Sequence, residues 1–341
     1  MTDIKRQKSD IIDVARAARV SPSTVSRSFN HPEMVNPATR KKIDRAVKKL
    51  GYIRNRAAQT MHGRRSGTIG LIVPTINHTI FSEVIQAFSD AIDAAGFTLL
   101  IASHGYDLDR EYEMMRKLLE HRVDGIALIG LEHTDASFNL IEQQAIPAIA
   151  IWNHDPNSTM ACVGADNREA GRMAAQHLLS FGHREIGLIF PQTTGNDRAR
   201  QRLEGAIDAL DTAGVTVPAS WHSEAPYSIA QAKRATTMVL EKHPRPTALL
   251  CGNDVIARGA LYAAQKTGIK VPEDLSVIGI GDFKGSEDLE PGLTTISIPA
   301  QDIGTIAGEN FARMITTGDT EILRFKCDLS CVVRGTTAAR T

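Results

Sequence analysis

The chain has 341 residues, of which 42% are apolar and 23% are charged, a balance typical of a soluble protein with an ample core. No apolar run reaches the eighteen residues of a membrane span, and the first residues, M-T-D-I-K-R-Q-K, lack the apolar core of a signal peptide. We therefore expect a cytoplasmic protein of more than one domain, without a membrane partner.

The net charge of zero conceals two unlike parts. Residues 1–66 contain 16 Lys and Arg against 5 Asp and Glu, a net charge of about +11. This leaves 23 against 34, a net charge of about −11, for the rest of the chain. A strongly basic segment favours contact with nucleic acid.

Residues 10–30 predict two short helices joined by a tight turn. Asp10 is placed to cap the first helix, and Ser21 is a natural N-cap for the second, with Pro22 at its first position. The outward face of the second helix carries short hydroxyls, an amide and one base, namely Ser23, Thr24, Ser26, Arg27 and Asn30. Such side chains reach base edges and phosphates in a major groove, so the segment predicts a DNA-binding helix-turn-helix. The alternative is an ordinary helical hairpin, and the basic charge favours DNA.

A third helix is expected from about residue 38 to residue 50, ended by Gly51. One side holds Ile43, Val47 and Leu50, and the other side holds six bases, namely Arg40, Lys41, Lys42, Arg45, Lys48 and Lys49. A solvated charged face is the alternative interpretation, but six bases against one acid favour phosphate contact.

The segment 55–62, N-R-A-A-Q-T-M-H, contains helix formers but too little apolar surface to be stable alone. It suits a linker that folds only when supported, for instance by DNA. Met61 could then enter a minor-groove base step as an apolar wedge. An ordinary linker methionine is the alternative.

From residue 68 onward, apolar strands alternate with amphipathic helices. Strands are expected at 69–73, 97–103, 125–131, 147–152, 161–165, 185–190, 247–252, 275–281 and 294–298. Helices are expected near 80–95, 109–121, 134–144, 167–181, 197–213, 228–243, 254–267 and 301–317. This β-α-β repetition predicts two doubly wound parallel-sheet lobes, and chain that crosses back between the lobes late in the sequence would form a hinge.

The whole chain resembles the LacI/GalR family of bacterial transcriptional regulators. The matching stretches are D-V-A-R-A-A-R-V-S-P-S-T-V-S-R at 13–27, L-G-Y-I-R-N at 50–55, A-A-Q-T-M at 57–61, G-H-R at 182–184, G-N-D at 252–254, D-L-S-V-I-G at 274–279 and L-T-T-I at 293–296. The resemblance implies a small all-α helix-turn-helix head, a hinge helix, and an α/β body like that of periplasmic sugar-binding proteins.

On this resemblance the head spans residues 1–53, the hinge and linker 54–66, and the effector-binding and dimerisation body 67–341. The first lobe takes about 67–164 plus 296–320, and the second takes about 165–295 plus 321–341.

The resemblance also implies roles for single residues in DNA binding. Pro22, Ser23 and Arg27 would read bases, and phosphates would be held by Ser21, Thr24, Ser26, Asn30 and Asn55. Ala58 and Met61 belong to the hinge that enters the minor groove. The chain departs from the family at Arg54, where a Pro is common, and at Met61, where Leu is common. Arg54 adds charge and lacks the rigidity of Pro, and Met61 is a softer substitute for Leu.

The family's effector positions fall on Ile80, Phe81, Trp152, Arg202, Tyr227, Asn253 and Asp282. Aromatic faces would stack on a ring, while Asn, Asp and Arg would orient hydroxyls or a carboxylate at the carboxyl ends of strands. Phe81 and Tyr227 could instead be core residues, and Asp282 could cap a turn. Arg202 lies beside two other bases, and any one of the three could face solvent, namely Arg198, Arg200 and Arg202. The I-G-I-G-D-F stretch at 278–283 resembles branches of the family that respond to sugar acids such as gluconate, and many relatives have an Asp where this chain has Trp152. Both features favour an acidic or flat polar ligand, so the expected effector is a sugar or a sugar acid.

Other functions have weaker support. The stretch G-I-G-D-F-K-G at 279–285 is not a dinucleotide loop, and motifs of P-loop, serine-hydrolase and metalloprotease enzymes are absent from the sequence. An enzyme acting on a small sugar-like metabolite is the alternative function. No cofactor and no metal are expected, and four scattered cysteines suggest reduced thiols.

We therefore expect a homodimeric regulator, acting as a repressor, that binds double-stranded operator DNA under the control of a small effector. The sequence does not choose between induction and co-repression.

Overall fold

The computed structural model describes residues 9–54, 65–77 and 81–340. Its contacts divide the chain into two compact units, Met1–Ser66 and Gly67–Thr341. Within the described residues, no helix is long and apolar enough to cross a membrane.

The head is built from three helices, α1 (Ile11–Ala18), α2 (Pro22–Asn30) and α3 (Pro37–Leu50), with a short 3₁₀ turn η1 (Pro32–Met34) before α3. Asp10 caps α1 in a reciprocal capping box, and Gly51 ends α3 in the left-handed conformation. A small core holds the helices together, and its buried members are Val14, Ala15, Ala18, Val25, Ile43 and Ala46. The predicted helix-turn-helix is confirmed.

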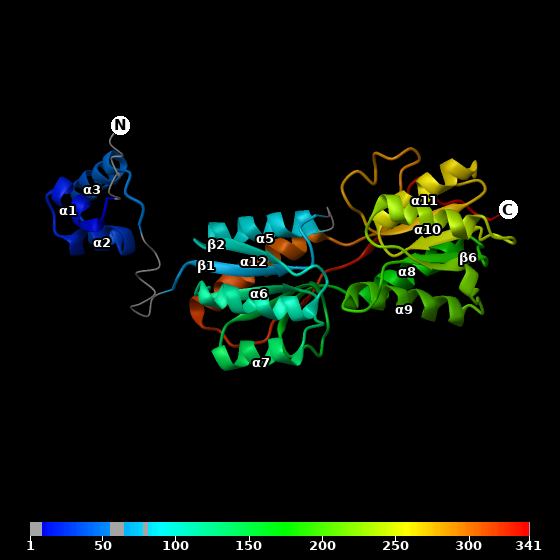
Figure 1. The fold of residues 1–341 in the computed structure, drawn as a ribbon, viewed down its shortest axis with the longest axis horizontal. Helices are drawn as coiled ribbons and strands as arrows, with labels where there is room; N and C mark the ends of the chain where they lie inside the picture. Colours follow the sequence, from blue (N-terminus) through cyan, green and yellow to red (C-terminus); the bar gives the residue numbers. More distant parts are fainter. Residues whose placement is uncertain (1–8, 55–64, 78–80, 341) are drawn as a thin grey trace, which may run out of the picture. The chain divides into compact units, whose positions relative to one another are not determined.

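The first lobe of the body, in which Figure 1 labels β1 and β2, contains one six-stranded sheet in the order β11-β5-β4-β3-β1-β2. Its strands are β1 (Thr68–Val73), β2 (Thr98–Ser103), β3 (Gly125–Ile129), β4 (Ala148–Asn153), β5 (Ala161–Ala165) and β11 (Arg324–Lys326). Helices α5 (Ser82–Ala94) and α12 (Ala300–Thr317) pack on each other and on β2, β4 and β5. Helices α6 (Leu108–Glu120) and α7 (Asp135–Gln144) form a second pair, of which α6 contacts β1 and β2.

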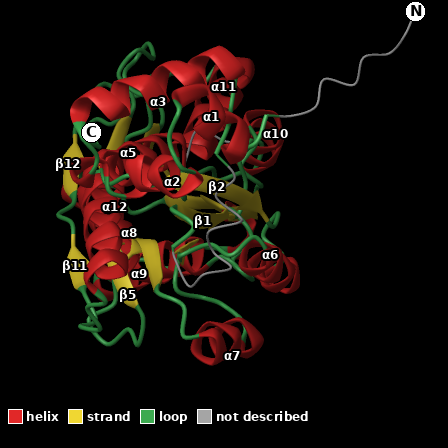
Figure 2. Ribbon diagram, turned by 90° about the vertical axis from the view of Figure 1, so that its left-hand side faces the viewer, coloured by secondary structure: helices red, strands yellow, loops and turns green. Residues whose placement is uncertain are grey.

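The second lobe repeats this plan with the strand order β12-β10-β9-β8-β6-β7. Its strands are β6 (Ile186–Phe190), β7 (His222–Glu224), β8 (Ala248–Cys251), β9 (Ser276–Gly281), β10 (Thr294–Ser297) and β12 (Ser330–Val332). Helices α8 (Asn167–Ser180) and α9 (Asp197–Thr212) form one pair, and α10 (Ile229–Leu240) and α11 (Asp254–Thr267) the other, with the short turn η3 (Ala219–Trp221) before β7. In Figure 2 the helices are red and the strands yellow.

The sheets are parallel except where β12 pairs antiparallel with β10. The carboxyl ends of the parallel strands are therefore the places where loops from both lobes can present side chains. The predicted α/β fold is confirmed.

Two lobe boundaries differ from the prediction. The predicted boundary at about 296 cuts through β10, but β10 pairs along its length with β9 and belongs to the second lobe. The segment from 321 was expected in the second lobe, but β11 pairs with β5 in the first. Strand pairing, which the sequence pattern does not show for such short strands, decides both positions.

Candidate functional sites in the head and the body

The beginning of α2 carries a cluster of hydroxyl groups. The Ser21 side chain accepts a hydrogen bond from the Thr24 backbone N–H and lies 2.7 Å from the Ser23 hydroxyl and 2.8 Å from the Thr24 hydroxyl. Ser21, Pro22, Ser23 and Arg27 are exposed, while Thr24, Ser26 and Asn30 are half-buried. The predicted base-reading residues therefore lie on the accessible side of the helix, opposite Val25 in the core.

Arg54, the residue where the chain departs from the family pattern, packs against the end of α2. Its guanidinium lies 5.6 Å from the centre of the Phe29 ring and donates hydrogen bonds to the Phe29 carbonyl, at 3.5 Å, and to the Asn30 side-chain oxygen. The Asn30 amide also donates to the Ser26 hydroxyl at 3.2 Å. Arg54 thus fastens the start of the linker to the head.

The bases of α3 form a second accessible surface. All six are exposed, namely Arg40, Lys41, Lys42, Arg45, Lys48 and Lys49. Four of the predicted site residues, Asn55, Ala58, Met61 and Ile80, lie outside the described residues.

In the body, Phe81 and Trp152 lie in edge-to-face contact with their ring centres 5.5 Å apart, and both are buried in the core. Trp152 is the next-to-last residue of β4 and has a φ of +87°, a backbone conformation that a bulky residue rarely adopts. Its indole Nε1 is buried and has no hydrogen-bond partner among the described residues. Strain and an unused donor at one residue are typical of a ligand site.

Arg202 is 3% exposed, so the solvent-facing alternative does not hold for this base. Its Nε donates to the Asn167 side-chain oxygen at 2.8 Å, and its Nη1 donates to the Gly252 carbonyl at 3.1 Å. Burial lowers the pKa of the guanidinium to about 10, with the nearby Tyr227 opposing that shift. Arg202 therefore carries its charge at neutral pH although it is buried.

Asn253 and Asp282 follow neighbouring strands, β8 and β9. The Asn253 oxygen caps α11 by accepting the Ile256 N–H at 3.0 Å, while its Nδ2 is buried and unpartnered within the described chain. Asp282 has a φ of +55° and pairs with Arg334 at 2.8 Å, both side chains being about one-fifth exposed (20% and 21%). Asp282 therefore already has a cationic partner.

A cavity of about 750 Å³ opens between the lobes. Of the six predicted effector residues that the structure describes, Tyr227 belongs to its lining. The other five do not, namely Phe81, Trp152, Arg202, Asn253 and Asp282. The lining residues include Tyr106, Asp107, Glu132, Gln192 and Asn196.

Tyr106 is a site residue that the sequence reasoning missed. Its ring centre lies 5.8 Å from that of Tyr227, both residues line the cavity, and its φ is +65°. Burial raises the pKa of its phenol, and the neighbouring Tyr227 adds to this. Tyr106 could have been predicted from its position just after the expected strand 97–103, because residues at the carboxyl ends of parallel strands face the cleft.

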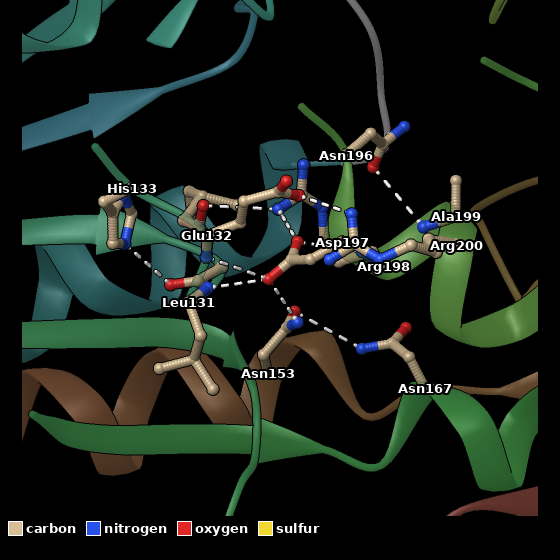
Figure 3. A network of polar contacts seen from close by, with 12 residues as sticks. Leu131, Glu132, His133, Asn153, Asn167, Asn196, Asp197, Arg198, Ala199 and Arg200 are labelled. Atoms are coloured by element: carbon tan, nitrogen blue, oxygen red, sulfur yellow. Dashed lines mark hydrogen bonds and ion pairs between the residues drawn. The ribbon is translucent and has the colours of Figure 1, made fainter. Parts of the chain in front are cut away.

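A buried polar network joins the lobes near this cavity (Figure 3). Its centre is Asp197, the first residue of α9, whose carboxylate accepts hydrogen bonds from the backbone of Leu131 and Glu132 in the first lobe. Asp197 was not predicted either, because only the bases of the segment N-D-R-A-R-Q-R at 196–202 were considered as ligand-binding residues.

The architecture defines a class of protein, a helix-turn-helix DNA-binding regulator with a two-lobed ligand-binding body. Family models match residues 10–55 to bacterial regulatory proteins of the lacI family and residues 175–337 to a periplasmic binding protein-like domain. The transcriptional regulator DegA of Bacillus subtilis is 34% identical over 87% of this chain and 88% of its own length. The transcriptional regulator GntR of Pseudomonas aeruginosa is 32% identical over 89% and 88%. The chain belongs to the lacI family of bacterial regulatory proteins, and the expected class, a DNA-binding regulator rather than an enzyme, is confirmed.

Solved structures show the same fold. The lac repressor dimer bound to operator and an anti-inducer is 26% identical, with a TM-score of 0.85, covering 98% of this chain and 100% of that one. The transcriptional regulator CelR in complex with cellobiose is also 26% identical, with a TM-score of 0.71, covering 96% and 99%.

Proposed function

We propose that this protein is a cytoplasmic repressor that binds operator DNA as a homodimer. Binding of a small polar ligand to the body raises or lowers its affinity for the operator. The DNA-binding part rests on the exposure of Ser21, Ser23 and Arg27 at α2 together with the exposure of the six bases of α3. In this proposal Pro22, Ser23 and Arg27 read base edges. Phosphates are held by Ser21, Thr24, Ser26, Asn30 and Asn55, and the minor groove receives Ala58 and Met61.

Selection of binding sites from a random DNA pool, followed by titration with the selected duplex and a scrambled one, tests this role. Arg27→Ala should weaken binding to the selected duplex by about 1–3 kcal/mol, since one base contact is lost, and change binding to the scrambled duplex little. Arg45→Ala on α3 is the matched control, because it removes one exposed base that would meet only phosphate and should weaken both duplexes alike. Equal losses for Arg27→Ala would show that it does not read bases.

The chemistry around Arg202 supports an acidic ligand. Two buried groups without partners in the described structure, the Trp152 Nε1 and the Asn253 Nδ2, are both hydrogen-bond donors, and Arg202 adds a buried cation. A ligand that satisfies these groups must bring acceptors, and a carboxylate bears the complementary charge. The tyrosines at 106 and 227 offer ring faces to a sugar. We therefore propose a sugar acid as the effector, with a neutral sugar, such as the cellobiose of the CelR complex, as the alternative.

A thermal-shift screen of the full-length protein against sugars, sugar acids, polyols and nucleosides tests this choice, because a ligand that binds only the folded state raises its melting temperature. A sugar acid should stabilise the wild-type protein and lose its effect in Arg202→Met. Stabilisation by nucleosides alone would contradict the proposal.

Dimerisation is supported by the free edge of the first lobe. Strand β2 ends the sheet, and its Leu100 and Ile101 are 37% and 45% exposed. An exposed apolar edge strand is a ready site for pairing with another chain. Sedimentation velocity should show a dimer for the wild type and a monomer for Ile101→Lys, and an unchanged dimer would exclude this edge.

A further inference from the structure

The Asp197 carboxylate reaches from the second lobe into the first. One of its oxygens accepts the Leu131 N–H at 2.7 Å, the Glu132 N–H at 3.2 Å and the Asn153 side-chain amide at 2.9 Å. These donors follow β3 or end β4, whereas Asp197 begins α9. One carboxylate therefore makes three hydrogen bonds across the cleft.

The buried charge of Asp197 is compensated within the same network. Asp197 is 3% exposed, and its second oxygen accepts both the backbone N–H and the Nη1 of Arg198, each at 2.8 Å. Arg198 in turn donates from Nη1 to the Ile129 carbonyl of the first lobe at 3.2 Å. A buried ion pair with its hydrogen bonds satisfied is tolerated, but removing one member leaves an uncompensated charge.

The absence of a side chain at Gly130 leaves room for Asp197 and Arg198. Gly130 has a φ of +92°, and a Cβ placed there would lie 2.3 Å from the Arg198 Nη1 and 2.9 Å from the Asp197 Oδ1. His133 stabilises the loop that carries Gly130. Its Nδ1 lies 2.9 Å from the Glu111 carboxylate, and its Nε2 lies 3.2 Å from the Gly130 carbonyl oxygen. Only glycine at this position lets the two charged side chains approach the first lobe.

A line of hydrogen bonds connects the carboxylate with the guanidinium of Arg202, and Figure 3 shows its part from Asp197 through Asn153 to Asn167. The Asn153 side-chain oxygen accepts from the Asn167 amide at 3.3 Å, and the Asn167 oxygen accepts from the Arg202 Nε at 2.8 Å. Asn153 therefore donates to Asp197 with its nitrogen and accepts from Asn167 with its oxygen. All four side chains are buried.

We propose that Asp197 is a latch that holds the lobes together without ligand, and that Asn167 and Asn153 link this latch to the ligand-binding guanidinium of Arg202. A ligand carboxylate that draws Arg202 away from Asn167 would change the hydrogen bonds that Asn153 offers to Asp197. The ligand thereby acquires different affinities for the latched and unlatched states, which is the condition for control of the lobes. The link to the ligand rests on the proposed function, whereas the latch itself does not.

Hydrogen exchange of the full-length protein, without DNA or ligand, tests the latch directly. Asp197→Asn should raise the exchange rate of the Leu131 and Glu132 amides on the order of tenfold or more, because their charged acceptor is lost. Amides inside β3 should keep their rates. Asp135→Asn is the matched control, since Asp135 likewise begins a helix but is exposed, and it should leave both amides unchanged.

Two further variants separate a latch from a general role in folding. Gly130→Ala should raise exchange at the same two amides, because the added methyl group displaces Arg198 and Asp197. Arg202→Met should raise the exchange rate of the Leu131 and Glu132 amides when Asp197 is present. It should have little additional effect in the Asp197→Asn variant, because the carboxylate to which Arg202 is linked is then missing.

Unchanged exchange at Leu131 and Glu132 in Asp197→Asn would overturn the latch, and so would an equal rise throughout β3. Equal effects of Arg202→Met in both backgrounds would overturn the link. Because no DNA or ligand is present, these outcomes are independent of whether the protein binds an operator or a sugar acid.

Discussion

Replacing Gly205 by alanine places a methyl group against the backbone of a neighbouring helix. Helices α8 and α9 cross at Gly171 and Gly205, where an added Cβ at 205 would lie 1.9 Å from the Arg168 carbonyl oxygen. The reciprocal contact from Gly171 to the Arg202 carbonyl oxygen is also 1.9 Å. An ordinary contact needs at least 3.4 Å, so either substitution must move the helices apart by about 1.5 Å.

The cost follows from two opposing effects. Overpacking against rigid backbone costs about 3 kcal/mol, the upper end of the usual range, because no side chain can rotate away. Alanine regains about 1 kcal/mol through its better helix propensity. The free energy of unfolding should therefore fall by about 2 kcal/mol, equivalent to a drop in melting temperature of about 4–8 °C.

Urea and thermal unfolding of the wild type, the two single variants and the double variant measure this effect. The double variant should lose much less than the sum of the single losses, because one separation of the helices accommodates both methyl groups. An unchanged or more stable Gly205→Ala would refute the close approach, and additive losses would refute the shared contact. Since α9 carries Asp197 and Arg202, ligand stabilisation should also weaken.

Three other outcomes are expected. Ser21→Ala should lower the stability of the head by about 1 kcal/mol through loss of the N-cap of α2, measured by circular dichroism, and unchanged melting would exclude that cap. Burial lowers the pKa of His183 and of His104, so the unfolded chain takes up protons first as the pH falls. The stability of the body should be constant above about pH 6.5 and decline below it, less steeply in His183→Gln. Asp282→Ala should abolish the response to the ligand found by thermal shift and leave operator affinity intact, so a normal response would remove Asp282 from the site.

The helix ends of the head could be predicted because their causes are local. Asp10, Ser21 and Gly51 act within one turn of the helix that each begins or ends, and the structure confirms all three. The longer strands of the body were also predicted, because buried parallel strands show as short apolar runs. Strands β7, β11 and β12 were missed, since each has three residues and none is fully buried along its length.

The candidate cleft was only partly predictable. Phe81 and Trp152, which were expected to face a ligand, lie in edge-to-face contact in the core, and Trp152 also presents an unsatisfied donor. Their contact with a ligand stays a prediction. Arg202 could not be chosen from its neighbours by sequence, because Arg198 and Arg200 are equally basic. In the folded chain, burial separates Arg202 from Arg200, whose side chain is 41% exposed, whereas Arg198 is buried as Arg202 is and differs from it by its pairing with Asp197.

The sequence by itself determined the helix-turn-helix head, its basic surface and the alternating α/β body. These features depend on periodicity, capping and charge, which act over a few neighbouring residues. Only the tertiary structure decided that Tyr106 faces Tyr227 and that Asp197 bridges the lobes. The amide of Leu131 and the carboxylate of Asp197 are 66 residues apart in the chain, and no local pattern in either segment specifies the other. Their meeting depends on how the two sheets are placed by the chain crossings, and therefore on the packing of the whole body.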